Sequence, residues 1–328
     1  MTKRKITALS FVSILALVLS IPSCKKYDLL PNTNTDELFS DLSDYHIFQG
    51  IPSDLNPAAG YELYELSTAL FSDYAEKQRL IKVPEGLKME ALSDGLPAFP
   101  DGTILVKTFF YYRDARDKTK GKRILETRLL IKSGSGWNAG TYLWNKDQTD
   151  ARLINDGLDR TVNWIDASGN PKVIAYHVPN INECGTCHNS NEGIIPIGPK
   201  LRNLNFIVNR HGLQVNQLQY LQDSSLLSQV DISKTGALPD WRNTTNSLEE
   251  RARAYLDINC AHCHKKDGLA SDTKLIFDYE MPIDETNILD RKNSILDKFS
   301  EGSMPKLGTT VVDKEALELL KTFLGSKK

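Results

Sequence analysis

The sequence predicts an α+β protein, in which an antiparallel β-sheet or sandwich is followed by a helical C-terminal region. Two observations support this class. At least five segments rich in β-branched and aromatic residues, separated by turn residues, follow one another between residues 55 and 180. After residue 246, two segments have apolar residues at helical spacing, and each begins at a residue suited to cap a helix. With 328 residues, the chain is long enough for two domains with separate cores.

The first residues have the pattern of an export signal. Three basic residues at 3–5 precede a largely apolar run over residues 6–21, shorter than the roughly 20 residues of a usual membrane span. The run ends at Ile21-Pro22-Ser23-Cys24, which is typical of a bacterial lipobox, where the cysteine is acylated. We therefore expect residues 1–23 to be a lipoprotein signal peptide and Cys24 to be a lipid anchor. A plain secretory signal is the alternative.

The next part of the chain grades from a tether into a β-rich domain. Residues 24–54 are polar and rich in turn residues, which predicts a tether with a first ordered segment near residues 42–48. Residues 61–79 have apolar residues at roughly helical spacing, which favours a helix over extended structure. We expect the β-rich domain over residues 55–180. Its predicted strands are residues 103–112, 123–132, 142–144, 161–165 and 173–178.

Two capped helices mark the C-terminal region, residues 247–328. The first begins at Ser247, because Glu250 three residues later completes a capping box. The second begins at Asp313 as N-cap, and we expect Gly325 to end it. A shorter helix is expected before this region, near residues 216–223.

Two five-residue motifs share one pattern, C-x-x-C-H. They are Cys184-Gly185-Thr186-Cys187-His188, within a segment over residues 181–246, and Cys260-Ala261-His262-Cys263-His264. This pattern is the attachment signature of haem c, because two thiols one helical turn apart form thioethers and the following imidazole ligates iron. We therefore expect two covalently bound haem c groups. Their attachment residues are Cys184, Cys187, Cys260 and Cys263, and their proximal iron ligands are His188 and His264.

The four thiols have alternatives to haem. Four thiolates can build a zinc site or two redox dithiols. A histidine directly after each cysteine pair favours haem, since a zinc site made of cysteines alone does not need it. With Cys24 acylated and the other four cysteines bound to haem, none of the five cysteines is left for a disulfide.

Met304 is the best candidate for the distal ligand of the second haem iron. It lies 40 residues after His264 and precedes the closing helix, with Met281 as runner-up. We expect His262, at an x position of its motif, to face away from the iron. The first haem has no comparable candidate, so its sixth position is open or is filled by one of His177, His211, Met281, Met89 and His46.

A helix that runs into C-x-x-C-H, a ligand methionine and a closing helix is the order of elements in a class I cytochrome c domain. With these residues in view, the mature chain resembles a family of exported bacterial two-haem c-type cytochromes whose physiological role is uncharacterised. The resemblance covers about residue 40 to the C-terminus, and it implies two covalent haems but no substrate. Besides the two motifs, the matching stretches are residues 70–75 (LFSDYA), 126–130 (ETRLL), 143–145 (LWN), 197–200 (IGPK), 251–256 (RARAYL) and 304–305 (MP).

The expected function is single-electron transfer in the cell envelope, by a carrier rather than a catalyst. Met/His ligation raises the reduction potential and closes the iron to substrates, which favours this function. The expected partners are redox proteins and a membrane reached through the lipid anchor, with the protein facing the periplasm or on the outer membrane. A net charge of −2 gives no sign of nucleic-acid binding. The alternatives are a haem enzyme, such as a dihaem peroxidase, with an open first iron, and a β domain that serves as a binding module.

Overall fold

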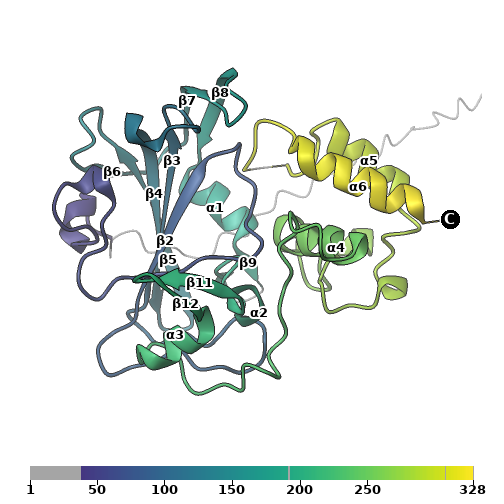
Figure 1. Ribbon diagram of the computed structural model, residues 1–328, viewed down its shortest axis with the longest axis horizontal. Coiled ribbons are helices and arrows are strands. Elements are labelled where there is room, and N and C mark those ends of the chain that lie inside the picture. The colour runs from purple at the N-terminus through teal and green to yellow at the C-terminus, as the bar shows by residue number, and fades with distance from the viewer. Residues whose placement is uncertain (1–37, 191–192, 307, 328) are drawn as a thin grey trace, which may run out of the picture.

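The computed structural model describes residues 38–190, 193–306 and 308–327. The predicted signal peptide and lipid anchor Cys24 lie outside the described residues. The predicted α+β class with an antiparallel sheet is confirmed: Figure 1 shows the sheet and its hairpins on the left and the C-terminal helices on the right. Among the described residues, no helix has the length and apolar character needed to cross a membrane.

The main sheet is an antiparallel meander whose six strands pair in the order of the sequence. Its strands are β1 (Glu62–Leu63), β2 (Glu76–Lys82), β3 (Ile104–Tyr112), β4 (Lys122–Ser133), β5 (Gly136–Trp144) and β6 (Ala151–Ile154). A separate hairpin follows, made of β7 (Leu158–Ile165) and β8 (Pro171–Val178). All five predicted strands are therefore confirmed, whereas β1, β2 and β6 were not predicted.

One face of the sheet packs on the segment that precedes it. Leu42, Tyr45 and Ile47 are buried there against Leu80, Val106 and other side chains of the sheet. The ordered segment predicted near residues 42–48 is confirmed. The chain belongs to the β-rich domain at least from Leu38 onward, so the predicted tether over residues 24–54 extends too far.

The helix expected over residues 61–79 is wrong. The chain forms β1 and β2 at the two ends of this segment, and the part between them is irregular. Asp73 and Tyr74 have φ of 54° and 65°, which an α-helix does not allow. Distant partners satisfy the backbone instead: Asn259 Oδ1 accepts a hydrogen bond from the Phe71 N–H at 2.7 Å.

The other face of the sheet carries two apolar clusters. One holds Leu105 and Leu218 and brings in helices from residues 181–246, and the other holds Phe109 and the hairpin residue Tyr176. The predicted first haem-binding segment therefore shares the core of the β-rich domain. Its elements are α1 (Ile181–Cys187), β9 (Asn189–Ser190), β10 (Gly193–Ile194), α2 (Leu201–Leu204), β11 (Ile207–Arg210), β12 (Leu213–Asn216) and α3 (Gln217–Asp223), the last confirming the helix predicted near residues 216–223.

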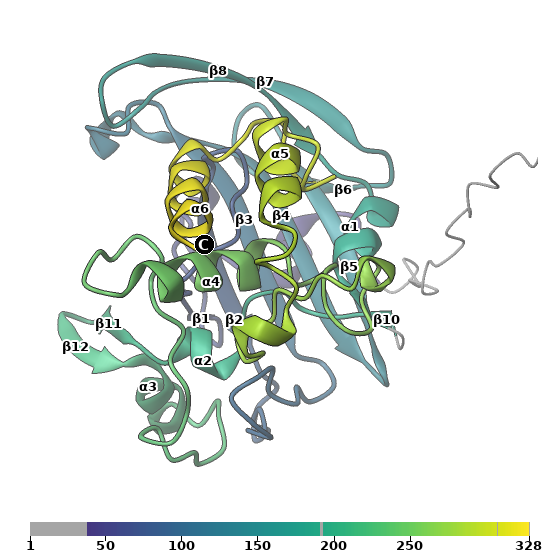
Figure 2. The ribbon, with the colours of Figure 1, turned by 90° about the vertical axis from the view of Figure 1, so that its right-hand side faces the viewer.

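The C-terminal helices are α4 (Leu248–Asn259), α5 (Lys292–Ser300) and α6 (Lys314–Ser326), and they share a separate apolar cluster. The capping box of Ser247 and Glu250 and the N-cap Asp313 are confirmed. Gly325 lies inside α6 and does not end it. Figure 2 shows α5 and α6 above α4, in front of the sheet. A cytochrome c-like character of this unit stays a prediction.

Short 3₁₀ turns complete the structure. They are η2 (Leu42–Tyr45), η3 (Pro52–Asp54), η4 (Lys118–Lys120), η5 (Ser271–Thr273) and η6 (Ile283–Glu285).

Candidate functional site

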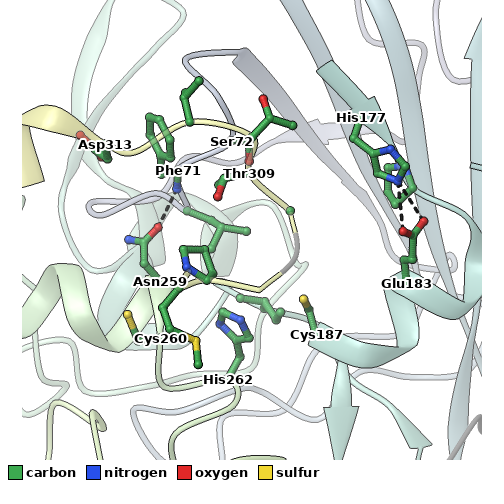
Figure 3. A pocket seen from close by; sticks show the side chains of 18 of the residues that line it. Phe71, Ser72, His177, Glu183, Cys187, Asn259, Cys260, His262, Thr309 and Asp313 are labelled. Carbon is green, nitrogen blue, oxygen red and sulfur yellow. Dashed lines mark hydrogen bonds and ion pairs between the residues drawn. The ribbon is translucent and has the colours of Figure 1, made fainter. Parts of the chain in front are cut away.

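Both C-x-x-C-H motifs contribute to the wall of one cavity. Its volume is about 270 Å³, and side chains of the sheet, of α1 and of the C-terminal helices line it. Figure 3 shows Cys187, Cys260 and His262 around this cavity. The first motif and the second begin 76 residues apart, so only the tertiary structure brings them together. The candidate site residues in the lining are Cys184, Cys187, His188, Cys260 and Met304.

The first motif lies on α1 and at its C-terminal end. Asn180 caps this helix, and Asn180 and Glu183 form a complete capping box. Cys184 and Cys187 lie one turn apart on the helix, and His188 is its C-cap. Residues 180–183 show the capping-box pattern in the sequence, and this signal could have predicted α1.

His188 is oriented through one ring nitrogen. Its Nδ1 lies 2.8 Å from the carbonyl oxygen of Ile195, which can only accept, so Nδ1 carries the proton and donates. No hydrogen-bond partner for Nε2 lies among the described residues. Burial lowers the pKa of His188 to about 3, so the ring is neutral at physiological pH. A neutral imidazole that donates Nδ1–H to a carbonyl has the usual arrangement of a metal-ligating histidine.

The second motif begins where α4 ends, with Cys260 as its C-cap. Cys263 and His264 lie in the following turn, outside the cavity lining. His264 Nδ1 lies 3.3 Å from Thr273 Oγ1, and its ring meets Phe277 edge-on with the ring centroids 5.3 Å apart. Burial lowers the pKa of His264 below its ordinary value. This histidine therefore has an Nδ1 partner as well, and Nε2 has none among the described residues.

The four thiols of the motifs are free and partly buried. Burial raises the pKa of Cys187 to about 12, and interaction with Cys263 and Cys184 adds to this shift. A zinc site needs its sulfur atoms about 4 Å apart, given a Zn–S distance of about 2.3 Å. Among the described residues, the one group of three or more side chains with ligand atoms within 4.8 Å of one another is acidic and contains no cysteine. The geometry therefore does not favour the zinc alternative.

Only some of the candidate distal ligands line the cavity. Met304 lies in the loop between α5 and α6 and lines the cavity. His177 also lines it, but its Nδ1 lies 2.7 Å from Asp159 and its Nε2 lies 3.1 Å from Glu183, so both nitrogens are engaged. The other candidates, which are absent from the lining, are Met281, His211, His46 and Met89. His211 and His46 are exposed, and Met89 is buried in an apolar cluster.

His262 belongs to the candidate site, although it occupies an x position of its motif. It lines the cavity, and its Nδ1 is buried without a hydrogen-bond partner among the described residues. Burial, with a smaller contribution from His264, lowers the pKa of His262 to about 4. That it faces away from the iron of its own motif stays a prediction.

Residues of the β-rich domain that the sequence did not predict also belong to the site. Lys107 of β3 and Arg128 of β4 line the cavity. Asp73 lies behind the lining and anchors the loop that follows Met304: its carboxylate accepts hydrogen bonds from the Thr310 N–H at 2.8 Å and from the Thr310 hydroxyl at 2.9 Å. Asp73 belongs to one of the stretches that carry the family resemblance, which was the available signal.

No family model, no curated protein and no solved structure matches this chain. Its function must therefore be inferred from its residues and their geometry.

Proposed function

We propose that this protein is a two-haem c-type cytochrome that transfers single electrons in the cell envelope. The observation that carries the proposal is that two C-x-x-C-H motifs from distant parts of the chain border one cavity. In addition, both motif histidines have an Nδ1 partner, and Nε2 of each has no partner within residues 38–190, 193–306 and 308–327. This arrangement fixes the ring and leaves Nε2 for iron.

The donor set fits covalent haem. The thiols of Cys184, Cys187, Cys260 and Cys263 are free to form the thioethers. When bound, haem c supplies a one-electron couple of ferrous and ferric iron. His188 and His264 would hold the two irons from the proximal side.

We propose Met304 as the distal ligand of the second haem iron. Its place in the loop between α5 and α6, two helices that share an apolar cluster with α4, supports this role. The packing of α4, which leads into Cys260, against α6 in a shared apolar cluster supports a cytochrome c-like unit over residues 247–328. A thioether ligand excludes substrates from the iron and raises its potential, which suits electron transfer.

The proposed location is the periplasmic side of a membrane or the outer membrane, with Cys24 as the lipid anchor and redox proteins as partners. The export pattern of residues 3–24 supports this part of the proposal.

The haem content of the exported protein tests the proposal. We expect a pyridine haemochrome assay to give two haems per chain, and the mass of the denatured chain to exceed that of the polypeptide by two haems. Covalently bound haem stays on the denatured chain because thioether bonds survive denaturation. Haem that is bound without covalent bonds would be lost, and the measured mass would not include it. One haem per chain, or none, would overturn the proposal.

A haem enzyme is the second candidate, and one observation favours it. Among the described residues that line the cavity, Met304 is the one methionine, and it can ligate only one iron. An iron held by His188 with no distal ligand would be open to peroxide or another small oxidant. Addition of cyanide separates the two candidates: a spectral shift of one haem favours the enzyme, and two unaffected low-spin haems favour the carrier.

A further inference from the structure

A row of polar side chains crosses the sheet on the face that borders the cavity. In the strand register, Arg79 of β2 lies opposite Lys107 of β3, Lys107 opposite Arg128 of β4, and Arg128 opposite Thr141 of β5. Residues directly opposite in an antiparallel pair project from the same face. Three cations therefore stand side by side on three neighbouring strands. We call Arg79, Lys107 and Arg128 the cationic row.

The cationic row is costly for the protein alone. Like charges directly opposite each other on a sheet destabilise it, and this row lies between two apolar clusters on the same face. One carboxylate compensates the row: Glu126, which is fully buried, accepts a hydrogen bond from Arg128 Nε at 2.9 Å and forms an ion pair with the guanidinium. Among the described residues, Glu126 is the one carboxylate that forms an ion pair with a member of the row, which holds three cations.

Two members of the row lack a polar partner. Lys107 makes no hydrogen bond to any described residue, and its Nζ lies 4.9 Å from the centroid of the Phe109 ring. Nη2 of Arg79 is buried without a hydrogen-bond partner among the described residues. Burial, with the charges of Arg79 and Arg128, lowers the pKa of Lys107 well below its usual value. Arg79 is buried and Lys107 is partly buried, and a cation withdrawn from water without a partner calls for a nearby anion.

The row ends beside the first attachment site. Thr141 Oγ1 lies 3.8 Å from Cys184 Sγ. Lys107 and Arg128 line the cavity together with Cys184 and Cys187. An anion attached to the first motif would therefore lie within the same enclosure as the two cations.

We infer that Lys107 and Arg128 form a carboxylate-binding site whose ligand is a propionate of the haem attached at Cys184 and Cys187. The inference rests on the proposed function. Haem combines an apolar ring with propionate carboxylates, which matches a cavity lined by Lys107 and Arg128 and by apolar side chains such as Leu70, Ile197 and Phe299. The guanidinium of Arg128 keeps Glu126 as one partner, and the unpartnered ammonium of Lys107 supplies the free donor. In this way the β-rich domain orients a haem that the α1 helix attaches.

The test compares Lys107→Met with Lys82→Met in the exported full-length protein. Lys82 is a partly buried lysine of the same sheet that lies over the Tyr61 ring, 5.0 Å from its centroid, and does not line the cavity. Haem content and the reduction potentials of both haems are measured by optical titration. We expect both variants to keep two haems. Only Lys107→Met should shift one potential to a more negative value, because loss of a nearby cation disfavours the added electron.

A charge-conserving variant separates electrostatics from packing. Lys107→Arg should hold the potential near that of the unaltered protein. An equal shift in Lys107→Met and Lys107→Arg, or no shift in Lys107→Met, would overturn the inference while two haems per chain leave the proposed function intact. If Lys107→Met does not accumulate, Lys107→Gln gives the same test, because it also removes the charge but keeps a polar side chain.

A free anion is the other source of a carboxylate-like ligand. Titration of the unaltered protein with inorganic phosphate distinguishes it: potentials that do not change with phosphate support the propionate. A saturable shift of one potential would mean that the site is open to free anions, and would overturn the propionate assignment. An unaltered protein without haem would overturn both the proposed function and this inference.

Discussion

The first C-x-x-C-H motif lies on a helix of seven residues packed against the sheet, whereas the second follows a helix of twelve residues in a unit with a separate apolar cluster. His188 donates to a backbone carbonyl and is the more strongly affected by burial, which lowers its pKa to about 3. His264 is partly buried and has a threonine hydroxyl as its partner. Equal attachment chemistry is thus placed in two different environments.

The environments also differ in charge and in available ligands. Lys107 and Arg128 border the first attachment site, and no described methionine is at hand for it besides Met304. Met304 belongs to the same unit as the second motif. The comparison teaches that the motif determines how a haem is attached, and that the surrounding residues determine its potential and whether its iron is closed.

Removal of one cysteine pair at a time has the largest expected effect. We expect two double variants, Cys184→Ser with Cys187→Ser and Cys260→Ser with Cys263→Ser, each to lower the haem content from two to one. The reason is that the first motif lies on α1 and the second follows α4, so each should form without the other. Intact mass and the pyridine haemochrome assay measure this. Cys24→Ser is the control that should keep both haems. Loss of both haems from either double variant would show that the two sites do not form independently.

Met304→Ala should affect the second haem alone. Without the thioether, its ferric iron becomes high-spin and its potential falls by on the order of 100 mV, well within the roughly 0.8 V that axial ligands span. Electron paramagnetic resonance and a redox titration measure the two changes. Met281→Ala is the matched control, because Met281 is outside the cavity lining. A change of the first haem instead would assign Met304 to the other site.

Asp73→Ala tests the anchor of the loop that carries Met304. The buried carboxylate accepts hydrogen bonds from three donors, which are the N–H and the hydroxyl of Thr310 and the N–H of Val311. Its removal should therefore lower the free energy of unfolding by roughly 1.5–3 kcal/mol. Urea denaturation measures this loss. Asp73→Asn should cost less, because asparagine keeps one acceptor and tolerates the positive φ. Equal losses in both variants would argue against a specific anchor.

His177 should give the region of the first motif a small pH dependence. Burial lowers its pKa, but hydrogen bonds to Asp159 and Glu183 outweigh this and raise the pKa above 6.5. Because the folded value is raised, the stabilisation is complete below pH about 6.5 and is lost as the pH rises through the folded value. His177→Gln should remove this fall of the melting temperature above pH about 6.5. The effect is small because the imidazole is partly exposed. If His177→Gln keeps the pH profile of the unaltered protein, the ion pairs of His177 do not contribute to stability.

Local patterns predicted the elements that local patterns stabilise. The strands of the sheet are rich in β-branched and aromatic residues, and the capping box at Ser247 and the N-cap Asp313 satisfy backbone groups within a few residues. The structure confirms these elements. No local pattern predicts the irregular segment between β1 and β2, because its backbone partners, such as Asn259 and Asn203, come from distant parts of the chain.

The candidate site shows the same division. The sequence by itself determined which residues can attach and ligate haem, because two thiols and an imidazole must be adjacent in the chain for that chemistry. Only the tertiary structure decided that both motifs border one cavity, that His177 is engaged by two carboxylates, and that three cations align across the sheet. Strand register and long-range packing depend on contacts between residues far apart in sequence, and no local pattern specifies them.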